Sequence, residues 1–166
     1  RLILTARRRE RLDGPARRLR EEHGAASLVI ELDVRDRAAV DAALRRLPAA
    51  WEAVDVLVNN AGLSRGLEKL AEANPVDYEE MVDTNVKGLL WVSQAVLPGM
   101  VARDRGHVVN IGSIAGHQVY AGGSVYCATK HAVGAITRGM RIDLLGTRVR
   151  VSTVDPGMVE TEFSLV

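Results

Sequence analysis

The chain alternates short apolar segments with amphipathic ones, and this alternation restricts its fold more than any other feature. Short strands that are apolar along their whole length are typical of a parallel sheet covered by helices on both faces. The pattern therefore predicts an α/β fold with a doubly wound parallel sheet, Rossmann-like in form. The expected strands span residues 2–6, 27–32, 55–58, 107–112 and 148–154.

Helices are expected between these strands. Asn74 followed by Pro75 is a typical helix start, with Asn as the cap and Pro in the first turn. Gly14-Pro15 would break a helix already under way, so we expect a new helix to begin there. The expected helices are one that starts near Pro15, one at 36–47, a long helical region from 75 to about 103 that bends or breaks around Asn85 and again near Pro98, and one at 124–145.

Length and composition fit one globular domain covering residues 1–166. The net charge of +1 gives no general attraction to nucleic acid or to an anionic membrane. The single cysteine, Cys127, excludes an internal disulfide and suits a reducing compartment, so we expect a cytoplasmic protein. No apolar run has the ~20 residues of a membrane span, and no residue pattern indicates a metal site.

Ser113, Tyr126 and Lys130 form the strongest candidate for a catalytic set. Side chains four residues apart share one helix face, so Tyr126 and Lys130 should stand side by side. A cation beside a phenol favours phenolate, and lowering the phenol pKa by about three units requires roughly 4 kcal/mol. Each residue alone is more often structural, but together they suit proton transfer to or from an alcohol.

This set resembles that of the short-chain dehydrogenase/reductase family, and the resemblance covers essentially all 166 residues. It implies that Tyr126 is the general acid/base and that Ser113 and Tyr126 contact the substrate. It also implies that Lys130 lowers the pKa of Tyr126 and, like Tyr126, contacts the nicotinamide ribose. Asn85, within Asp83-Thr84-Asn85-Val86, matches the catalytic Asn of the family, whose helix kink connects the lysine to solvent.

The same resemblance implies a dinucleotide site. Arg7 and Arg8 follow the strand at 2–6, where arginine accommodates the 2′-phosphate of NADP and an acidic residue would favour NAD. We therefore expect NADP, with NAD less favoured. The remaining expected cofactor residues are the adenine-binding pair Asp33 and Val34, Asn60 of the Asn-Asn-Ala-Gly turn, and Pro156, Gly157, Val159 and Thr161 of the covering loop.

The Gly-rich phosphate loop of this family is absent from the chain. The chain resembles a family member without its first βα unit and its C-terminal part. In the doubly wound strand order, that first strand lies between the strands at 2–6 and 55–58. We therefore expect these two strands not to pair with each other, and a longer polypeptide to supply the remainder.

Within the family, the chain is most similar to NADP-dependent 3-hydroxy acid dehydrogenases, which also oxidise serine-like substrates. The segments that carry this similarity are 87–88, 97–100, 120–123 and 161–163. Arg65 and Arg138 are candidates to bind a substrate carboxylate. Two alternatives remain open: a reductase of 3-ketoacyl, aldehyde or ketone substrates, and a non-catalytic nucleotide-binding interaction protein. Apolar residues on several faces of the helices at 76–103 and 124–145 favour a homodimer or homotetramer through these helices.

Overall fold

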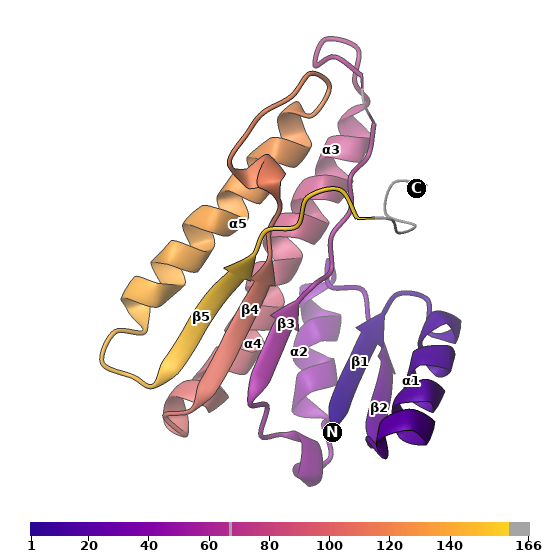
Figure 1. Ribbon diagram of the computed structural model, residues 1–166, viewed down its shortest axis with the longest axis vertical. Coiled ribbons are helices and arrows are strands. Elements are labelled where there is room, and N and C mark those ends of the chain that lie inside the picture. Colours follow the sequence, from indigo (N-terminus) through magenta and orange to yellow (C-terminus); the bar gives the residue numbers. More distant parts are fainter. Residues whose placement is uncertain (67, 160–166) are drawn as a thin grey trace.

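The computed structural model describes residues 1–66 and 68–159, and its strands form two separate parallel sheets (Figure 1). In the first sheet, β1 (Leu2–Ala6) pairs with β2 (Ser27–Glu31). The second has the order β3-β4-β5, with β3 (Val56–Asn59), β4 (Gly106–Ile111) and β5 (Val149–Val154). Because all pairs are parallel, the carboxyl ends of the three strands in the second sheet meet at one edge.

The helices begin where the sequence supplies caps. Asp36 accepts a hydrogen bond from the amide of Ala39, and Asn74 accepts one from the amide of Val76. No helix in the described ranges is long and apolar enough to cross a membrane. The helices are α1 (Glu10–His23), α2 (Arg37–Arg45), α3 (Pro75–Val82), a π-helical turn (Asp83–Gly88), α4 (Leu89–Ala102) and α5 (Ser124–Asp143).

The expected helix start at Pro15 is wrong, and the helix does not break at Pro98. Helix α1 begins at Glu10 and includes Pro15, and α4 continues through Pro98 to Ala102. A proline inside a helix removes one hydrogen bond and costs about 3 kcal/mol. Favourable charges at the ends of α1, acidic in the first turn and basic in the last, and burial of α4 against the sheet offset that cost.

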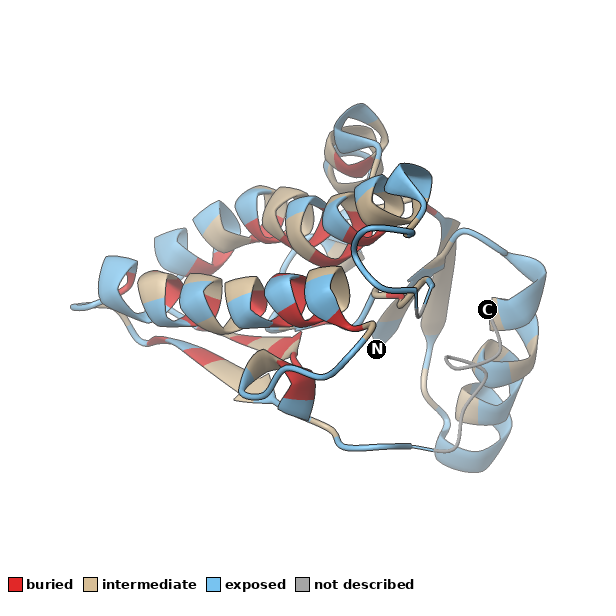
Figure 2. Cartoon of the chain, turned by 90° about the horizontal axis from the view of Figure 1, so that it is seen from above, coloured by how far each residue is buried: buried red, intermediate tan, exposed pale blue. Residues whose placement is uncertain are grey.

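The apolar core lies between the second sheet and helices α4 and α5, whose buried faces point toward the sheet (Figure 2). Met100 of α4 and Val108 of β4 are fully buried at its centre. By contrast, α1 contains no buried residue, so the first sheet and its helix contribute nothing to this core. The core residues are Leu89, Val96, Met100, Val108, Val133, Met140, Leu144, Val149 and Val151.

A cleft of about 1210 Å³ separates β1 from β3, which are not hydrogen-bonded to each other. The expectation that these strands do not pair is therefore confirmed. Some apolar strand residues are nevertheless open to solvent in the described residues: Val56, Val58 and Val154 are at least half exposed.

Candidate active site

Ser113, Tyr126 and Lys130 lie together at the carboxyl edge of the second sheet. Ser113 directly follows β4, and its Oγ accepts a hydrogen bond from the amide of Ala115 (3.1 Å). The Ser113 hydroxyl also hydrogen-bonds to the phenol of Tyr126. The Lys130 Nζ is 5.8 Å from the centre of the Tyr126 ring, one turn further along α5. The three side chains thus face one another as their spacing predicts.

The pKa of Tyr126 is raised, not lowered, and this corrects the expectation from the sequence. Burial disfavours the phenolate and raises the pKa of Tyr126. The hydrogen bond from Ser113 acts in the opposite direction but does not cancel the effect of burial. In this structure the Tyr126 phenol is therefore protonated at neutral pH and suited to donating a proton.

Lys130 is 6% exposed, and its Nζ donates a hydrogen bond to the backbone carbonyl of Ile111 (2.9 Å). Burial lowers the pKa of Lys130 to about 8, although the negative charge of Asp155 opposes the shift. Lys130 therefore remains mostly protonated at pH 7 and loses its charge in mildly alkaline solution.

Asn85 lies in the π-helical turn between α3 and α4, where the sequence predicts a bend. Its side chain is 2% exposed and forms hydrogen bonds with both backbone groups of Leu63. Its amide also donates to Thr129 Oγ1 (3.0 Å), and Thr129 belongs to the same helix as Tyr126 and Lys130. Asn85 thereby links the segment after β3 to the catalytic helix.

The carboxyl end of the cleft collects five of the expected cofactor residues: Arg7, Arg8, Asp33, Val34 and Asn60. This end approaches the catalytic set at Gly62, which also lines the cleft. A Cβ at Gly62 would lie 3.3 Å from the Asn85 Oδ1 and 3.6 Å from the Lys130 Nζ. The absence of a side chain here lets the backbone lie directly against the two polar groups.

Two of these cofactor residues have partners that the sequence did not suggest. The Arg35 guanidinium forms a fork on the Asp33 carboxylate, with distances of 2.6 to 3.0 Å. The Arg35 hydrogen bonds lower the pKa of Asp33. Arg7 pairs with Glu80 of α3 (3.3 Å). Asp33-Val34-Arg35 is contiguous in sequence, so its pairing could have been anticipated, but nothing local indicates Glu80.

The covering loop is only partly described. Pro156 is partly buried, and its carbonyl accepts a hydrogen bond from the amide of Ile114 (3.1 Å), beside Ser113. Gly157 and Val159 are exposed and lie outside the lining of the cleft. Thr161 falls outside the described residues.

The two candidates for carboxylate binding are now distinguishable. Arg65 shares a small crevice with Tyr126 and pairs with Glu80 (2.9 Å). Arg138 is exposed and lies twelve residues beyond Tyr126 in α5, roughly 18 Å along the helix axis. Arg138 therefore lies too far from Tyr126 to bind the carboxylate of a small substrate at the catalytic set.

Sequence reasoning also missed a buried polar chain beneath the site. Asn59 donates to Ser93 (2.9 Å) and to Asn110 (2.8 Å), and Asn110 donates to Thr137 (2.8 Å). All four side chains are less than 10% exposed. An asparagine inside the apolar run at 107–112 was the available indication, because a buried amide requires partners.

Comparison with known proteins settles the family. The profile described as "short chain dehydrogenase" matches residues 1–165. The chain belongs to the short chain dehydrogenase family. It is 51% identical, over 166 residues, to an Escherichia coli K12 protein named NADP-dependent 3-hydroxy acid dehydrogenase YdfG. It is 42% identical to an NADP-dependent 3-hydroxy acid dehydrogenase of Schizosaccharomyces pombe. These matches cover 99% of the chain but only 65% and 64% of the two relatives.

Solved structures of short chain dehydrogenases superpose closely on the chain. Serine dehydrogenase from Escherichia coli matches with a TM-score of 0.88 at 50% identity, over 95% of this chain and 71% of that one. A closed form of serine dehydrogenase complexed with NADP⁺ matches with a TM-score of 0.91 at 50% identity, over 98% of this chain and 64% of that one. The Rossmann-like fold expected from the sequence is therefore confirmed.

Proposed function

We propose that the protein is an NADP-dependent oxidoreductase that interconverts a small 3-hydroxy acid and its keto form. The observation that carries the proposal is the convergence of Ser113, Tyr126 and Lys130 at the carboxyl edge of the second sheet, with Asn85 tied to the same helix. The names of relatives at 42–51% identity support both the cofactor and the substrate class. The chain spans about 65% of those relatives, so the activity is proposed for the full-length protein.

The residues at the carboxyl end of the cleft fit a dinucleotide phosphate. Arg7 and Arg8 supply positive charge at one end, and the backbone at Gly62 approaches the catalytic lysine at the other. The Thr84 hydroxyl in the cleft wall is buried without a hydrogen-bond partner among the described residues. A buried hydroxyl in this condition favours a polar ligand nearby. Asp33, Val34, Asn60, Pro156, Gly157, Val159 and Thr161 complete the proposed cofactor site.

For carbonyl reduction, bound NADPH would supply the hydride and leave as NADP⁺, and the protein's own residues handle the proton. In the direction of carbonyl reduction, the protonated Tyr126 phenol donates its proton to the substrate oxygen. The Ser113 hydroxyl holds that oxygen and also hydrogen-bonds the phenol. Lys130, charged at pH 7, favours the phenolate left after transfer. Asn85 keeps the lysine-bearing helix in register with the segment after β3.

Assembly and compartment extend the proposal. We infer a homodimer or homotetramer formed through the helices at 76–103 and 124–145, where apolar residues such as Val101 and Ile142 are exposed outside the core. The single free cysteine, Cys127, is buried and consistent with a cytoplasmic protein. Light scattering at micromolar concentration tests the assembly, and a mass of one chain would contradict it.

The decisive experiment measures NADPH oxidation by the full-length protein on a panel of β-keto acids, aldehydes and ketones. Turnover of β-keto acids above the other classes supports the proposal. Preference for another carbonyl class would reassign the substrate, and the absence of turnover together with retained nucleotide binding would indicate a non-catalytic protein. Replacing Arg7 and Arg8 with Gln should raise the KM for NADPH far more than the KM for NADH.

A further inference from the structure

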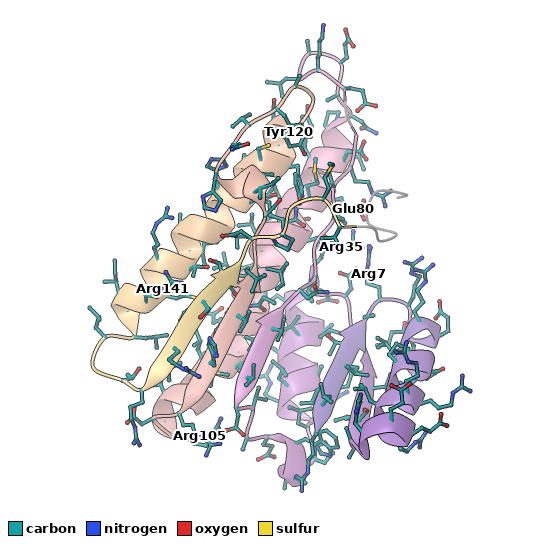
Figure 3. The ribbon with its side chains drawn as sticks, in the orientation of Figure 1. Arg7, Arg35, Glu80, Arg105, Tyr120 and Arg141 are labelled. Carbon is teal, nitrogen blue, oxygen red and sulfur yellow. The ribbon has the colours of Figure 1, made fainter. Side chains whose placement is uncertain are left out.

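An acidic residue, Asp155, lies beside the anchor point of Lys130 at the carboxyl edge of the second sheet. The Lys130 Nζ donates to the carbonyl of Ile111 (2.9 Å), and Ile111 pairs with Val154 of β5. Asp155 is the residue that follows Val154. Helix α5 packs over β5, where Arg141 Nε donates to a strand carbonyl (2.7 Å; Figure 3). The end of β5 and the lysine-bearing turn of α5 are therefore neighbours.

The absence of a side chain at Gly112 makes room for the Asp155 carboxylate. Backbone hydrogen bonds continue the pairing of β4 with β5 past the strand ends. The Gly112 amide donates to the Val154 carbonyl (2.8 Å), and the Ile114 amide donates to the Pro156 carbonyl (3.1 Å). A Cβ on Gly112 would overlap Oδ1 of Asp155. The carboxylate is therefore held against the backbone at the end of β4.

This carboxylate and Lys130 lie on the same face of the sheet. Asn110 of β4 donates to Thr137 of α5 (2.8 Å), so its side chain faces that helix. Strand side chains two residues apart share a face, and the place left open at Gly112 therefore faces α5 as well. Asp155 fills this place, and its negative charge favours the charged form of Lys130.

His117 fixes the second oxygen of the same carboxylate. Its Nε2 lies at hydrogen-bond distance from Oδ2 of Asp155 (3.1 Å). The preceding residue, Gly116, packs on the catalytic helix, since a Cβ there would lie 2.9 Å from the Lys130 carbonyl oxygen. Figure 3 shows Tyr120 further along this segment, away from the sheet. The segment after β4 thus contacts both the lysine turn and the carboxylate.

Few charged groups surround the lysine side chain. Among the described residues, Lys130 faces the Tyr126 ring on its own helix, the Ile111 carbonyl at the end of β4, the backbone at Gly62 after β3, and Asp155 after β5. Tyr126 is neutral at pH 7, so Asp155 supplies the negative charge in this set. Because Lys130 is 6% exposed, water screens that charge poorly.

We propose that Asp155, held in place by His117, maintains the positive charge of Lys130. The inference rests on the proposed function for the role of the lysine and adds two positioning residues to it. Both residues act through Lys130. Without the carboxylate, burial acts on the ammonium unopposed, and Lys130 loses its proton at a lower pH.

NMR of the full-length protein labelled with ¹³C at the lysine Cε reports this charge directly, and Lys130→Met identifies the signal. In Asp155→Asn, the midpoint of the Lys130 titration should fall by on the order of one pH unit, the effect of one nearby charge. Asp155→Ser removes the same charge with a smaller side chain and should give the same result. Asp143→Asn removes a charge from the exposed far end of α5 and should not move the midpoint. An unmoved midpoint in the folded Asp155 variants would overturn the inference.

Two variants test the contribution of His117. His117→Ala should lower the midpoint by less than Asp155→Asn does, because the carboxylate remains but is no longer held. His117→Gln keeps a side-chain N–H donor and should restore the wild-type midpoint. An unmoved midpoint in His117→Ala would overturn the role of His117.

The rate of β-keto acid reduction by NADPH separates this inference from the proposed function. The alkaline decline of kcat should begin on the order of one pH unit lower in Asp155→Asn than in wild type. At pH 6, where Lys130 is charged in both proteins, the two kcat values should agree within about twofold. A shifted lysine titration with an unshifted rate profile would support the pairing of Asp155 with Lys130 and overturn the part of Lys130 in the proposed reaction.

Discussion

At the scale of single residues, the proposed chemistry depends on two groups that burial pushes toward their neutral forms. Burial raises the pKa of Tyr126 and lowers that of Lys130 to about 8. A neutral phenol is ready to donate a proton, but a buried ammonium is costly for the fold. Activity and stability therefore make opposite demands at Lys130.

Removing the Tyr126 hydroxyl should abolish turnover with little effect on structure. Tyr126→Phe is expected to lower kcat by about 10²- to 10⁴-fold, the usual contribution of a positioned general acid. Nucleotide binding, measured by titration calorimetry, should remain within a factor of two or so. Tyr78→Phe, which removes a phenol from α3, serves as the matched control. A Tyr126→Phe protein with near-normal kcat would remove Tyr126 from the mechanism.

Neutralising Lys130 should stabilise the protein at pH 7 while inactivating it. The folded-state pKa of about 8 lies below the ordinary lysine value of 10.5, so the unfolded chain binds more protons between these pH values. The resulting penalty is fully present below pH 8, and it fades as the pH rises toward 10.5. Removing it at pH 7 contributes on the order of 3 kcal/mol, less the loss of the hydrogen bond to Ile111.

Urea denaturation of Lys130→Met and wild type at pH 7 and pH 10 measures this effect. The variant should have the higher free energy of unfolding at pH 7, and the difference should shrink at pH 10. Equal free energies at pH 7 would show that the buried ammonium is compensated by interactions other than the contact with Ile111.

At the scale of elements, the π-helical turn at Asp83–Gly88 positions the Asn85 side chain in the candidate active site. Single π-helical turns inside α-helices are rare, and those that occur are often found at functional sites. Here the turn directs the Asn85 side chain to both backbone groups of Leu63, which is itself 6% exposed. The Asn85 side chain therefore supplies hydrogen-bond partners to the backbone N–H and carbonyl of Leu63 in the segment after β3.

Asn85→Ala should consequently destabilise the fold through Leu63. It leaves a buried N–H and a buried carbonyl without partners, at about 1–3 kcal/mol for each unsatisfied group. The midpoint of urea denaturation should fall, and the exposed Asn60→Ala should change the free energy of unfolding by about 0.5 kcal/mol or less. A midpoint equal to that of wild type would mean that water satisfies Leu63 instead.

Local sequence rules predicted the elements well and the long-range contacts poorly. The predicted strand bounds agree with the observed ones to within about a residue, because apolar runs and flanking turn residues are local signals. The Asn74 cap was predicted correctly for the same reason. Pro15 and Pro98 did not interrupt their helices, because surrounding charges and burial outweighed the local cost of proline in a helix. The ion pairs of Glu80 with its three arginines could not be predicted from the sequence, since no spacing rule relates residues 7, 35, 65 and 80.

At the scale of the whole molecule, the described residues form two parts, of which only one contains the main buried core, and α2 packing on α4 helps to join them. The second sheet contains the buried core, whereas β1, β2 and α1 contain no fully buried residue. Across the cleft, Arg7 and Arg35 reach Glu80, and α2 packs on α4, where the Arg37 guanidinium lies 4.9 Å from the centre of the Trp91 ring. Ion pairs therefore contribute much of the connection at the carboxyl edge.

Hydrogen exchange of the 166-residue chain should reveal this division. Amides of β1, β2 and α1 are expected to exchange faster than those of β4, because local opening there exposes little apolar surface. Raising the salt concentration to about 1 M shortens the screening length to about 3 Å, which weakens the Arg7 and Arg35 pairs with Glu80. Exchange in β1 and β2 should then accelerate while β4 stays protected. Uniform protection across both sheets, insensitive to salt, would mean that the layers unfold as one unit and that the cleft between β1 and β3 closes in solution.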